Sequence, residues 1–237
     1  MPTNTLLTIF RPKTMDELAP NRRDRLVSVA KATAAAVPFV GGVISELLTE
    51  TIPELRFDRA IAFIRELDEE LRRINAKLES VERNLKNEQG IDLLEEGILQ
   101  ASRSVSTDRK LRLARLVARS LGGEELEYEQ ARSLLSIYRG LTDPEIIWLI
   151  FYSMNPALGR GPHSDWIEQH PEVLKPISKE MGAPQEQHER AAIQDLWKEN
   201  LKRYGLIQAR GNSMSITTLG RMLVRYIQED QVSEGES

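Results

Sequence analysis

The chain has 237 residues, of which 41% are hydrophobic and 29% charged, with 32 Lys and Arg against 36 Asp and Glu. This composition is typical of a soluble globular protein with one large domain or two small ones. Because there is no cysteine, disulfide frameworks, cysteine-ligated zinc, iron–sulfur clusters and thiol catalysis are excluded. No basic residue precedes the short apolar run Leu6 to Phe10, so we expect no secretory signal and a cytoplasmic location.

The first distinctive element is the apolar segment 27–48. It has 14 uncharged residues between Lys31 and Glu46, whereas a helix that spans a membrane needs about 20. We interpret the segment as a kinked helix buried in a helical bundle. In the alternative, Pro38 and the Gly41–Gly42 pair divide it into two short apolar helices that insert into a membrane when the protein is triggered.

An apolar stripe then runs from Phe57 to Leu85 with alternating spacings of three and four residues, and neither Gly nor Pro interrupts residues 54–89. The pattern predicts one long heptad helix of about 50 Å. Such a stripe needs a partner, which is another helix of this chain or a second copy. The predicted self-association stripe consists of Ile64, Leu67, Leu71, Ile74, Leu78, Val81 and Leu85.

Shorter helices follow. Gly90 is interpreted as a helix stop, and apolar spacing marks a helix from Ile91 to Val105. Ser106 to Asp108 offer N-caps for a helix that Gly122 and Gly123 close. This helix has a basic face consisting of Arg109, Arg112, Arg115 and Arg119. We interpret the face as solvated or paired within the chain, because acidic residues are close in sequence; the alternative is an anionic partner such as a nucleic-acid backbone or lipid headgroups.

The remaining chain is predicted to be helical with one hairpin. A helix from Glu127 to Tyr138 ends at Gly140, and Thr142 and Pro144 open the next one. Residues 155–184 are irregular, with short helices near 164–169 and 172–181. The later elements are a helix over 185–204, strands over 206–210 and 213–216, a helix over 217–227 and an acidic disordered tail over 229–237.

Charge is unevenly distributed over the last hundred residues. Residues 141–188 have a net charge of −4, residues 189–227 of +4, and residues 228–237 of −4. This alternation indicates pairing within the chain at least as readily as an external anionic partner.

Enzyme signatures are absent from the sequence. His163, His170 and His188 have no spacing typical of a helical metal site, and residues 159–162 lack the Lys-Ser/Thr pair of a phosphate-binding loop. No serine lies in a G-x-S-x-G motif. We therefore predict a protein that is not an enzyme and that needs no cofactor and no metal.

The phrase DLWKENLKRYGLIQARGNSMSITTLGRMLVRYI resembles the end of winged-helix modules, in which a helix leads into a β-wing and a closing helix. In the members that bind DNA, the helix before the wing enters the major groove, which implies anion or nucleic-acid contacts here from Arg190, Lys198, Lys202, Arg203 and Arg210. The competing interpretation is a structural or protein-contacting winged helix, because Glu189, Asp195 and Glu199 lie on the same helix.

More widely, residues 91–228 resemble the Abi-alpha group of bacterial proteins that is linked to abortive infection. The matching features are LLEEGILQASRSVSTDRKLRLARLVARSL, the helix opened by LTDPEIIWL, and the GLI...ITTLG ending. The resemblance implies a bacterial origin and a role in antiphage defence.

The predicted fold is therefore mainly α, with a helical bundle or coiled-coil region over 1–140 and a winged-helix-like module with a two-stranded β-wing over 141–228. The predicted function is non-enzymatic macromolecular binding with self-association, so the expected partner is a second copy or a helical protein. The alternatives are a membrane-acting effector that uses residues 27–48 and a DNA-binding regulator; a nucleic-acid partner is the less favoured interpretation.

Overall fold

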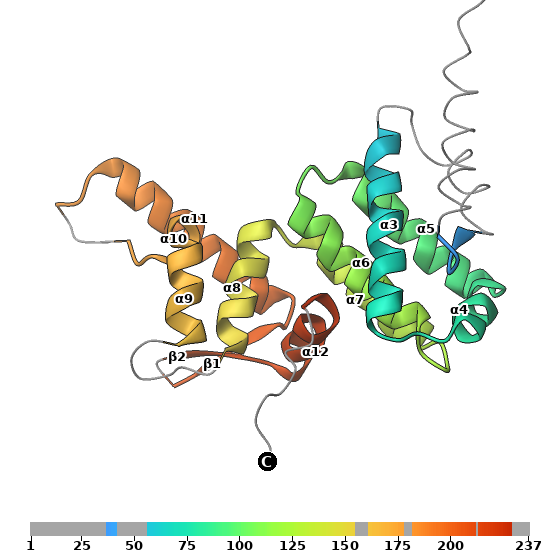
Figure 1. Cartoon of the computed structure of the whole chain (residues 1–237). Helices are drawn as coiled ribbons and strands as arrows, with labels where there is room; N and C mark the ends of the chain where they lie inside the picture. Colours follow the sequence, from blue (N-terminus) through green and yellow to red (C-terminus); the bar gives the residue numbers. More distant parts are fainter. Residues whose placement is uncertain (1–36, 42–55, 155–160, 178–181, 212, 229–237) are drawn as a thin grey trace, which may run out of the picture.

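The computed structural model describes residues 37–41, 56–154, 161–177, 182–211 and 213–228, and these are mainly helical, with a small two-stranded antiparallel sheet near the C-terminus (Figure 1). The helices are α3 (Phe57–Arg73), α4 (Leu78–Leu85), α5 (Glu88–Arg103), α6 (Thr107–Leu121), α7 (Tyr128–Gly140), α8 (Asp143–Ser153), α9 (Pro162–Gln169), α10 (Pro171–Leu174), α11 (Gln185–Arg203) and α12 (Thr218–Ile227). The strands are β1 (Ile207–Arg210) and β2 (Ser213–Ile216).

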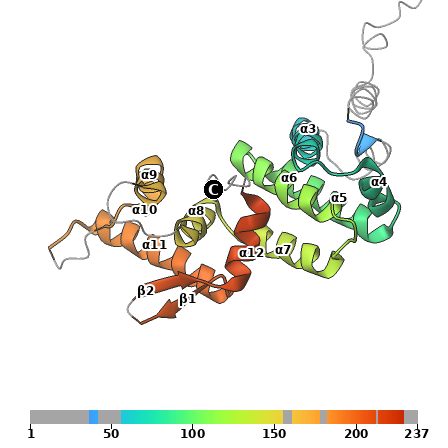
Figure 2. The same ribbon diagram turned by 60° about the horizontal axis from the view of Figure 1, so that its bottom comes forward.

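Helices α3 to α7 form a bundle in which α3 packs across α5 and α6 (Figures 1 and 2). Apolar residues recur along α3 at helical spacing, so one face of the helix is buried, including Phe57, Ile64 and Leu71. On α6 the apolar face predicted from the sequence is also buried, including Leu113 and Val117.

The prediction of one helix from Phe57 to Leu85 is wrong, because the chain turns between α3 and α4. Asn75 adopts a left-handed conformation with φ of 53°. The N–H of Asn75 donates to the carbonyl of Arg72, and the N–H of Ala76 donates to the carbonyl of Leu71, both at 3.0 Å. These two bonds form a Schellman motif, which ends a helix and in which Asn is the common substitute for Gly.

The break folds the predicted self-association stripe into the interior of the chain's own bundle. Ile64, Leu67, Leu71, Val81 and Leu85 are buried. At the turn between the helices, Ile74 is half-buried and packs on the core, and Leu78 is 42% exposed. The stripe therefore serves intramolecular packing and is not available as a continuous seam for a second copy; self-association itself stays a prediction.

The prediction that Gly90 stops a helix is also wrong, because Gly90 lies inside the first turn of α5. A Cβ atom at this position would lie 2.0 Å from the carbonyl oxygen of Asn84. The glycine is needed because the backbone of α4 passes too close for any side chain.

Local signals do fix several helix ends. Ser106 Oγ accepts the N–H of Arg109 at 3.1 Å and caps α6, as its position before the periodic segment predicts. Thr142 and Glu145 form a capping box at the start of α8, with Pro144 in the first turn. Helix α7 ends at Gly140, as predicted from the sequence.

The C-terminal elements pack on the bundle through α12. Strand β1 pairs with β2 so that Ile207 lies opposite Ile216 and Arg210 opposite Ser213. Helix α12 contacts both α6 and α8, and Figure 2 shows it between the hairpin and the bundle. Hydrophobic residues of both regions belong to one buried cluster. Of the predicted helix over 172–181, α10 covers Pro171–Leu174, residues 175–177 are not helical, and residues 178–181 lie outside the described residues.

Most of the apolar segment 27–48 and all of the tail 229–237 lie outside the described residues. Of the segment, residues 37–41 are described: Val37 and Val40 are buried, and the Phe39 N–H donates to Asp68 Oδ1 at 3.2 Å. The segment 37–41 therefore contacts α3 through Phe39. Among the described helices, none combines the length and the apolar character that crossing a membrane requires.

Candidate functional site

The basic face predicted on α6 is held largely by contacts within the chain. Arg109 Nη1 pairs with Asp143 Oδ1 at 3.1 Å, and its Nη2 donates to the Tyr138 carbonyl at 2.9 Å. Arg115 pairs with the buried carboxylate of Glu70 at 3.2 Å. The interpretation of this face as internally paired is therefore confirmed for these two residues, although their partners lie on α8 and α3 rather than among the acidic residues close in sequence.

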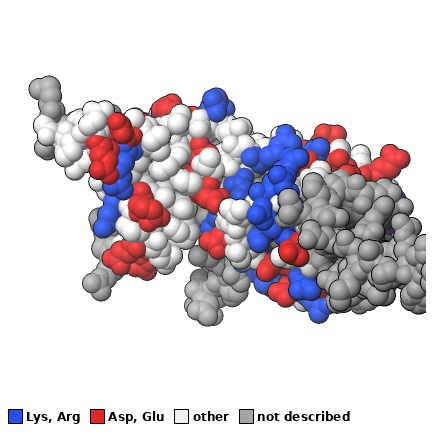
Figure 3. Space-filling view, turned by 90° about the horizontal axis from the view of Figure 1, so that it is seen from above, with Lys and Arg blue, Asp and Glu red and all other residues white. Residues whose placement is uncertain are grey.

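The other two arginines of the basic face differ from each other. Arg119 donates to the carbonyls of Arg225 and Gln228, at the C-terminus of α12, where a cation also complements the helix dipole. Arg112 is half-buried near His170, whose pKa is lowered by burial and, to a smaller extent, by this positive charge. Figure 3 shows that Lys and Arg side chains gather on the face seen from above.

The five basic residues predicted on α11 and the hairpin are not gathered into one surface. Lys198 Nζ lies 4.2 Å from the centre of the Trp148 ring, and Lys202 pairs with Glu199 at 2.6 Å on the same helix. The Arg203 guanidinium lies 5.8 Å from the Tyr204 ring. Arg190 is exposed beside a small apolar pocket of α10 and α11. Only Arg210, on β1, lines the large groove described below.

The surface of α11 is unlike that of a DNA-reading helix. The helix has four acidic and four basic residues, so its net charge is zero. Two large apolar side chains, Ile193 and Leu196, are 46% and 52% exposed. A helix that reads DNA needs an excess of positive charge to approach phosphates.

The net positive charge of the C-terminal region lies on the hairpin and α12. Residues 204–228 contain Arg210, Arg221 and Arg225 and no acidic residue. The excess that the sequence places in residues 189–227 therefore belongs mainly to these elements.

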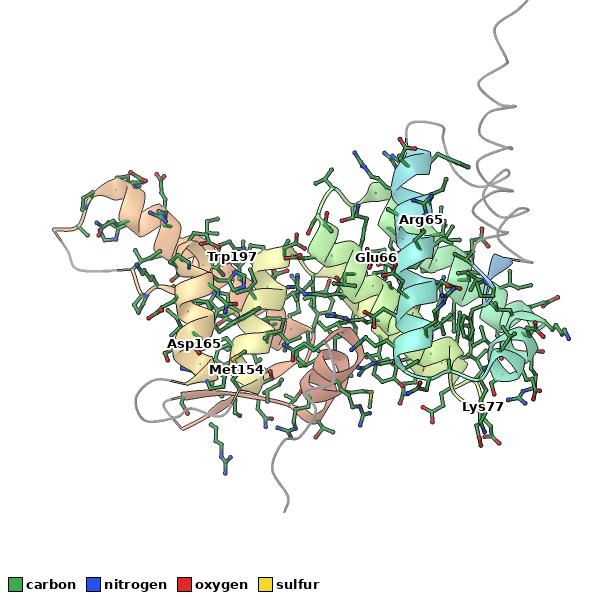
Figure 4. All side chains as sticks on the ribbon, in the orientation of Figure 1. Arg65, Glu66, Lys77, Met154, Asp165 and Trp197 are labelled. Carbon is green, nitrogen blue, oxygen red and sulfur yellow. The ribbon has the colours of Figure 1, made fainter. Side chains whose placement is uncertain are left out.

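A hollow with a volume of about 830 Å³ lies between the hairpin, the end of α8 and the start of α9. Figure 4 places Met154 at the end of α8, next to the hairpin, and Asp165 on α9. The residues that line the groove are Phe151, Tyr152, Ser153, Met154, His163, Gln208, Arg210, Ser213, Met214, Ser215, Ile216 and Arg221. We call this hollow the wing groove.

The hairpin contributes residues of both its faces to the lining of the wing groove, and the polar ones share a single face. Gln208 pairs with Ser215 and Arg210 with Ser213, and alternate residues of a strand lie on one face. All four side chains therefore share one face of the two-stranded sheet. Gly211 has φ of +62° and permits the tight turn that brings the two strands together.

The opposite wall of the wing groove is aromatic. Helix α8 is apolar on all sides, so its last turn presents Phe151 and Tyr152 while its other apolar residues fill the core. The centres of the Phe151 and His163 rings lie 4.1 Å apart. The Tyr152 ring stacks on the Trp148 ring, with centres 5.7 Å apart. Burial raises the pKa of Tyr152, so its phenol stays neutral near pH 7.

The groove is electropositive. Among the described residues that line it, Arg210 and Arg221 are charged and none is acidic. Arg221 Nη1 donates to the Ile216 carbonyl at 3.3 Å, which holds this guanidinium against the end of β2. Asp165, the acidic residue of α9 in Figure 4, is exposed and does not line the groove.

The sequence interpretation missed Arg221 and the aromatic wall. The aromatic run of α8 and the arginine in residues 217–227 are both visible in the sequence, but about 70 residues separate them. Only the packing of α12 and the hairpin on α8 brings them to one groove.

Known proteins and metal sites give no independent indication of function. Among the described residues, no group of three or more His, Asp and Glu side chains is placed to hold a metal ion. Comparison of the chain with protein-family models, with curated proteins and with solved structures finds no match in any of the three. The resemblance to the Abi-alpha group and the role in antiphage defence that it implies stay predictions.

Proposed function

We propose that the protein acts by binding rather than by catalysis, and that the wing groove binds single-stranded nucleic acid. The observation that carries the proposal is the combination, in one groove of about 830 Å³, of two arginines, an aromatic wall and no acidic side chain among the described lining residues.

The chemistry of the groove matches the two requirements of single-strand binding. Guanidinium groups of Arg210 and Arg221 neutralise phosphates of the backbone. Unpaired bases expose flat faces that stack on aromatic side chains, and Phe151, Tyr152 and His163 supply such surfaces. A duplex hides its base faces, so the aromatic wall favours a single strand.

The order of elements from α8 to α12 also fits the winged-helix module that the sequence resembles, with the β1–β2 hairpin as the wing. The proposal places binding on the wing side of this module. Helix α11, which would enter the major groove in a DNA-reading member, has no net charge and exposes Ile193 and Leu196. This surface favours the single-strand function over sequence-specific reading of duplex DNA.

The test measures the binding of fluorescently labelled single-stranded and duplex oligonucleotides to the full chain by anisotropy at several salt concentrations. Arg210→Gln/Arg221→Gln removes both cations of the groove. The matched control is Arg65→Gln/Lys86→Gln, which removes two exposed cations of the bundle; Figure 4 shows Arg65 on α3, in the other half of the molecule.

We expect the wild type and the control to prefer the single strand and the groove variant to bind at least about tenfold more weakly. Because each phosphate contact contributes about −0.7 to the slope of log affinity against log salt, the variant's slope should be shallower by about 1.4. Equal affinities of the groove variant and the control would refute the proposal. Equally tight binding of poly-glutamate would also refute it, because that polymer has charge but no bases.

A further inference from the structure

A second, smaller cationic hollow lies away from the wing groove, where α5 ends and α6 begins. It has a volume of about 220 Å³ and is lined by Gln100, Arg103, Ser104, Arg109 and Arg139. In Figure 1 this end of the bundle points upward, and Figure 3 views the molecule from that side, where Lys and Arg side chains gather. We call this hollow the arginine pocket.

Three arginines from three different elements line the arginine pocket. Arg103 is the last residue of α5, Arg109 belongs to the first turn of α6, and Arg139 lies at the end of α7. No acidic residue is among the described residues that line it. Like charges repel, and the carboxylates of Asp143 and Glu96 offset part of the repulsion by pairing with Arg109 and Arg139.

Two of the three guanidinium groups are held in place by contacts outside the pocket lining. Arg109 pairs with Asp143 at 3.1 Å, donates to the Tyr138 carbonyl and lies 4.8 Å from the centre of the Tyr138 ring. Arg139 Nη1 lies 3.4 Å from Glu96 Oε1. Since a guanidinium has five N–H donors, both groups keep donors for a ligand.

Arg103 differs from the other two arginines. It is exposed, and it has no ion pair among the described residues. A bound anion would therefore form its first ion pair with Arg103, in addition to contacts with Arg109 and Arg139, which are already positioned.

The wall of the pocket contains a polar group with an unmet hydrogen-bonding requirement. Gln100 Nε2 donates to Glu96 Oε1 at 2.8 Å and to the Leu135 carbonyl at 3.1 Å, which fixes the orientation of the amide. Gln100 Oε1 is buried and has no hydrogen-bond partner in the described structure. Leaving a buried acceptor unpaired costs about 1–3 kcal/mol, so a ligand that brings an O–H donor together with its anionic group would gain a hydrogen bond if the Gln100 amide turned toward the pocket.

We propose that the arginine pocket binds the phosphate group of a small phosphate ester. Guanidinium groups form paired hydrogen bonds with phosphate oxygens, and a hollow of about 220 Å³ admits a phosphate with a small hydroxylated group attached. The same phosphate chemistry occurs in the free ion and at the end of a phosphorylated nucleic-acid strand. This inference does not depend on the wing groove.

The test is isothermal titration calorimetry of the full chain with three probes, namely inorganic phosphate, ribose 5-phosphate and ribose, at constant ionic strength set with chloride. The variant Arg103→Gln/Arg139→Gln removes two cations of the pocket. Arg109 is kept because it also pairs with Asp143 and supports the fold. The control Lys86→Gln removes an exposed cation of α4's C-terminal end, and circular dichroism with a melting curve checks that all variants are folded.

We expect the wild type and Lys86→Gln to bind both phosphate probes but not ribose, and the pocket variant to bind them at least tenfold more weakly. A 5′-phosphorylated oligonucleotide that competes better than its unphosphorylated form would identify a strand end as the source of the phosphate, and ribose 5-phosphate that binds more tightly than inorganic phosphate would identify a small ester. Absence of heat with the wild type, or equal affinity of the pocket variant and the control, would overturn the inference.

Discussion

Glu145 links the start of α8 to α11, and its loss is expected to destabilise the C-terminal region. The residue is 1% exposed, and its two carboxylate oxygens accept the Thr142 N–H and the Asn200 Nδ2 donor, each at 2.6 Å. A hydrogen bond to a charged group contributes about 1.5–3 kcal/mol, and removing the acceptor leaves buried donors unsatisfied. We therefore expect Glu145→Ala to reduce the free energy of unfolding by about 3–5 kcal/mol.

The measurement is urea unfolding followed by far-UV circular dichroism at pH 7. Glu168→Ala, at an exposed position of α9, is the control and should change the free energy of unfolding by less than about 0.5 kcal/mol. A double-mutant cycle of Glu145→Ala with Asn200→Ala should give a coupling of about 1–3 kcal/mol, since the two side chains are in direct contact. A loss below 1 kcal/mol for Glu145→Ala, or strictly additive effects in the cycle, would refute the reasoning.

Three further changes test the bundle by the same unfolding assay. Gly90→Ala should cost several kcal/mol because its Cβ would overlap the Asn84 carbonyl, whereas Gly182→Ala, which meets no atom within 4 Å, should be nearly neutral; similar effects of the two would contradict the close approach. Asn75→Ala should lower the free energy of unfolding by about 1–2 kcal/mol, because alanine disfavours the left-handed conformation, whereas Asn75→Gly should leave it unchanged. Equal losses for the two variants would contradict a left-handed residue at this turn. Burial raises the pKa of Glu96, but hydrogen bonds from Gln100 and from Arg132 outweigh it and lower that pKa. A lowered folded-state pKa gives stability that is present above the unfolded pKa of about 4.3 and is lost as the pH falls through the folded value. The difference between wild type and Glu96→Gln, about 1 kcal/mol at pH 7, should therefore disappear in acid, and a difference that persists at pH 2 would contradict this assignment.

Short-range signals were sufficient to predict much of the secondary structure. Ser106 and Thr142 cap the helices that follow them, and their positions before apolar periodic segments identify them without knowledge of the fold. The hairpin was predicted with an error of one residue, because Gly211 lies between two short strand-like segments. Each of these features depends on the conformation of a few neighbouring residues.

The same local information was insufficient at Asn75 and Gly90. The apolar spacing continues through Asn75 without a break, and Asn is compatible with either a continuing helix or a Schellman end. The turn is favourable because it allows Val81 and Leu85 to bury against the same bundle as Ile64. Glycine at position 90 is explained by the proximity of α4, which no local pattern records.

The sequence by itself determined the helical class, the hairpin after α11 and the excess of positive charge near the C-terminus. Only the tertiary structure decided which charges are available to a ligand, because pairing depends on partners that are distant in sequence. Arg115, for example, is engaged by Glu70, which is 45 residues away. Arg210 and Arg221 instead line a groove whose other wall comes from α8 and α9, and this arrangement exists only once α12 and the hairpin have packed on α8.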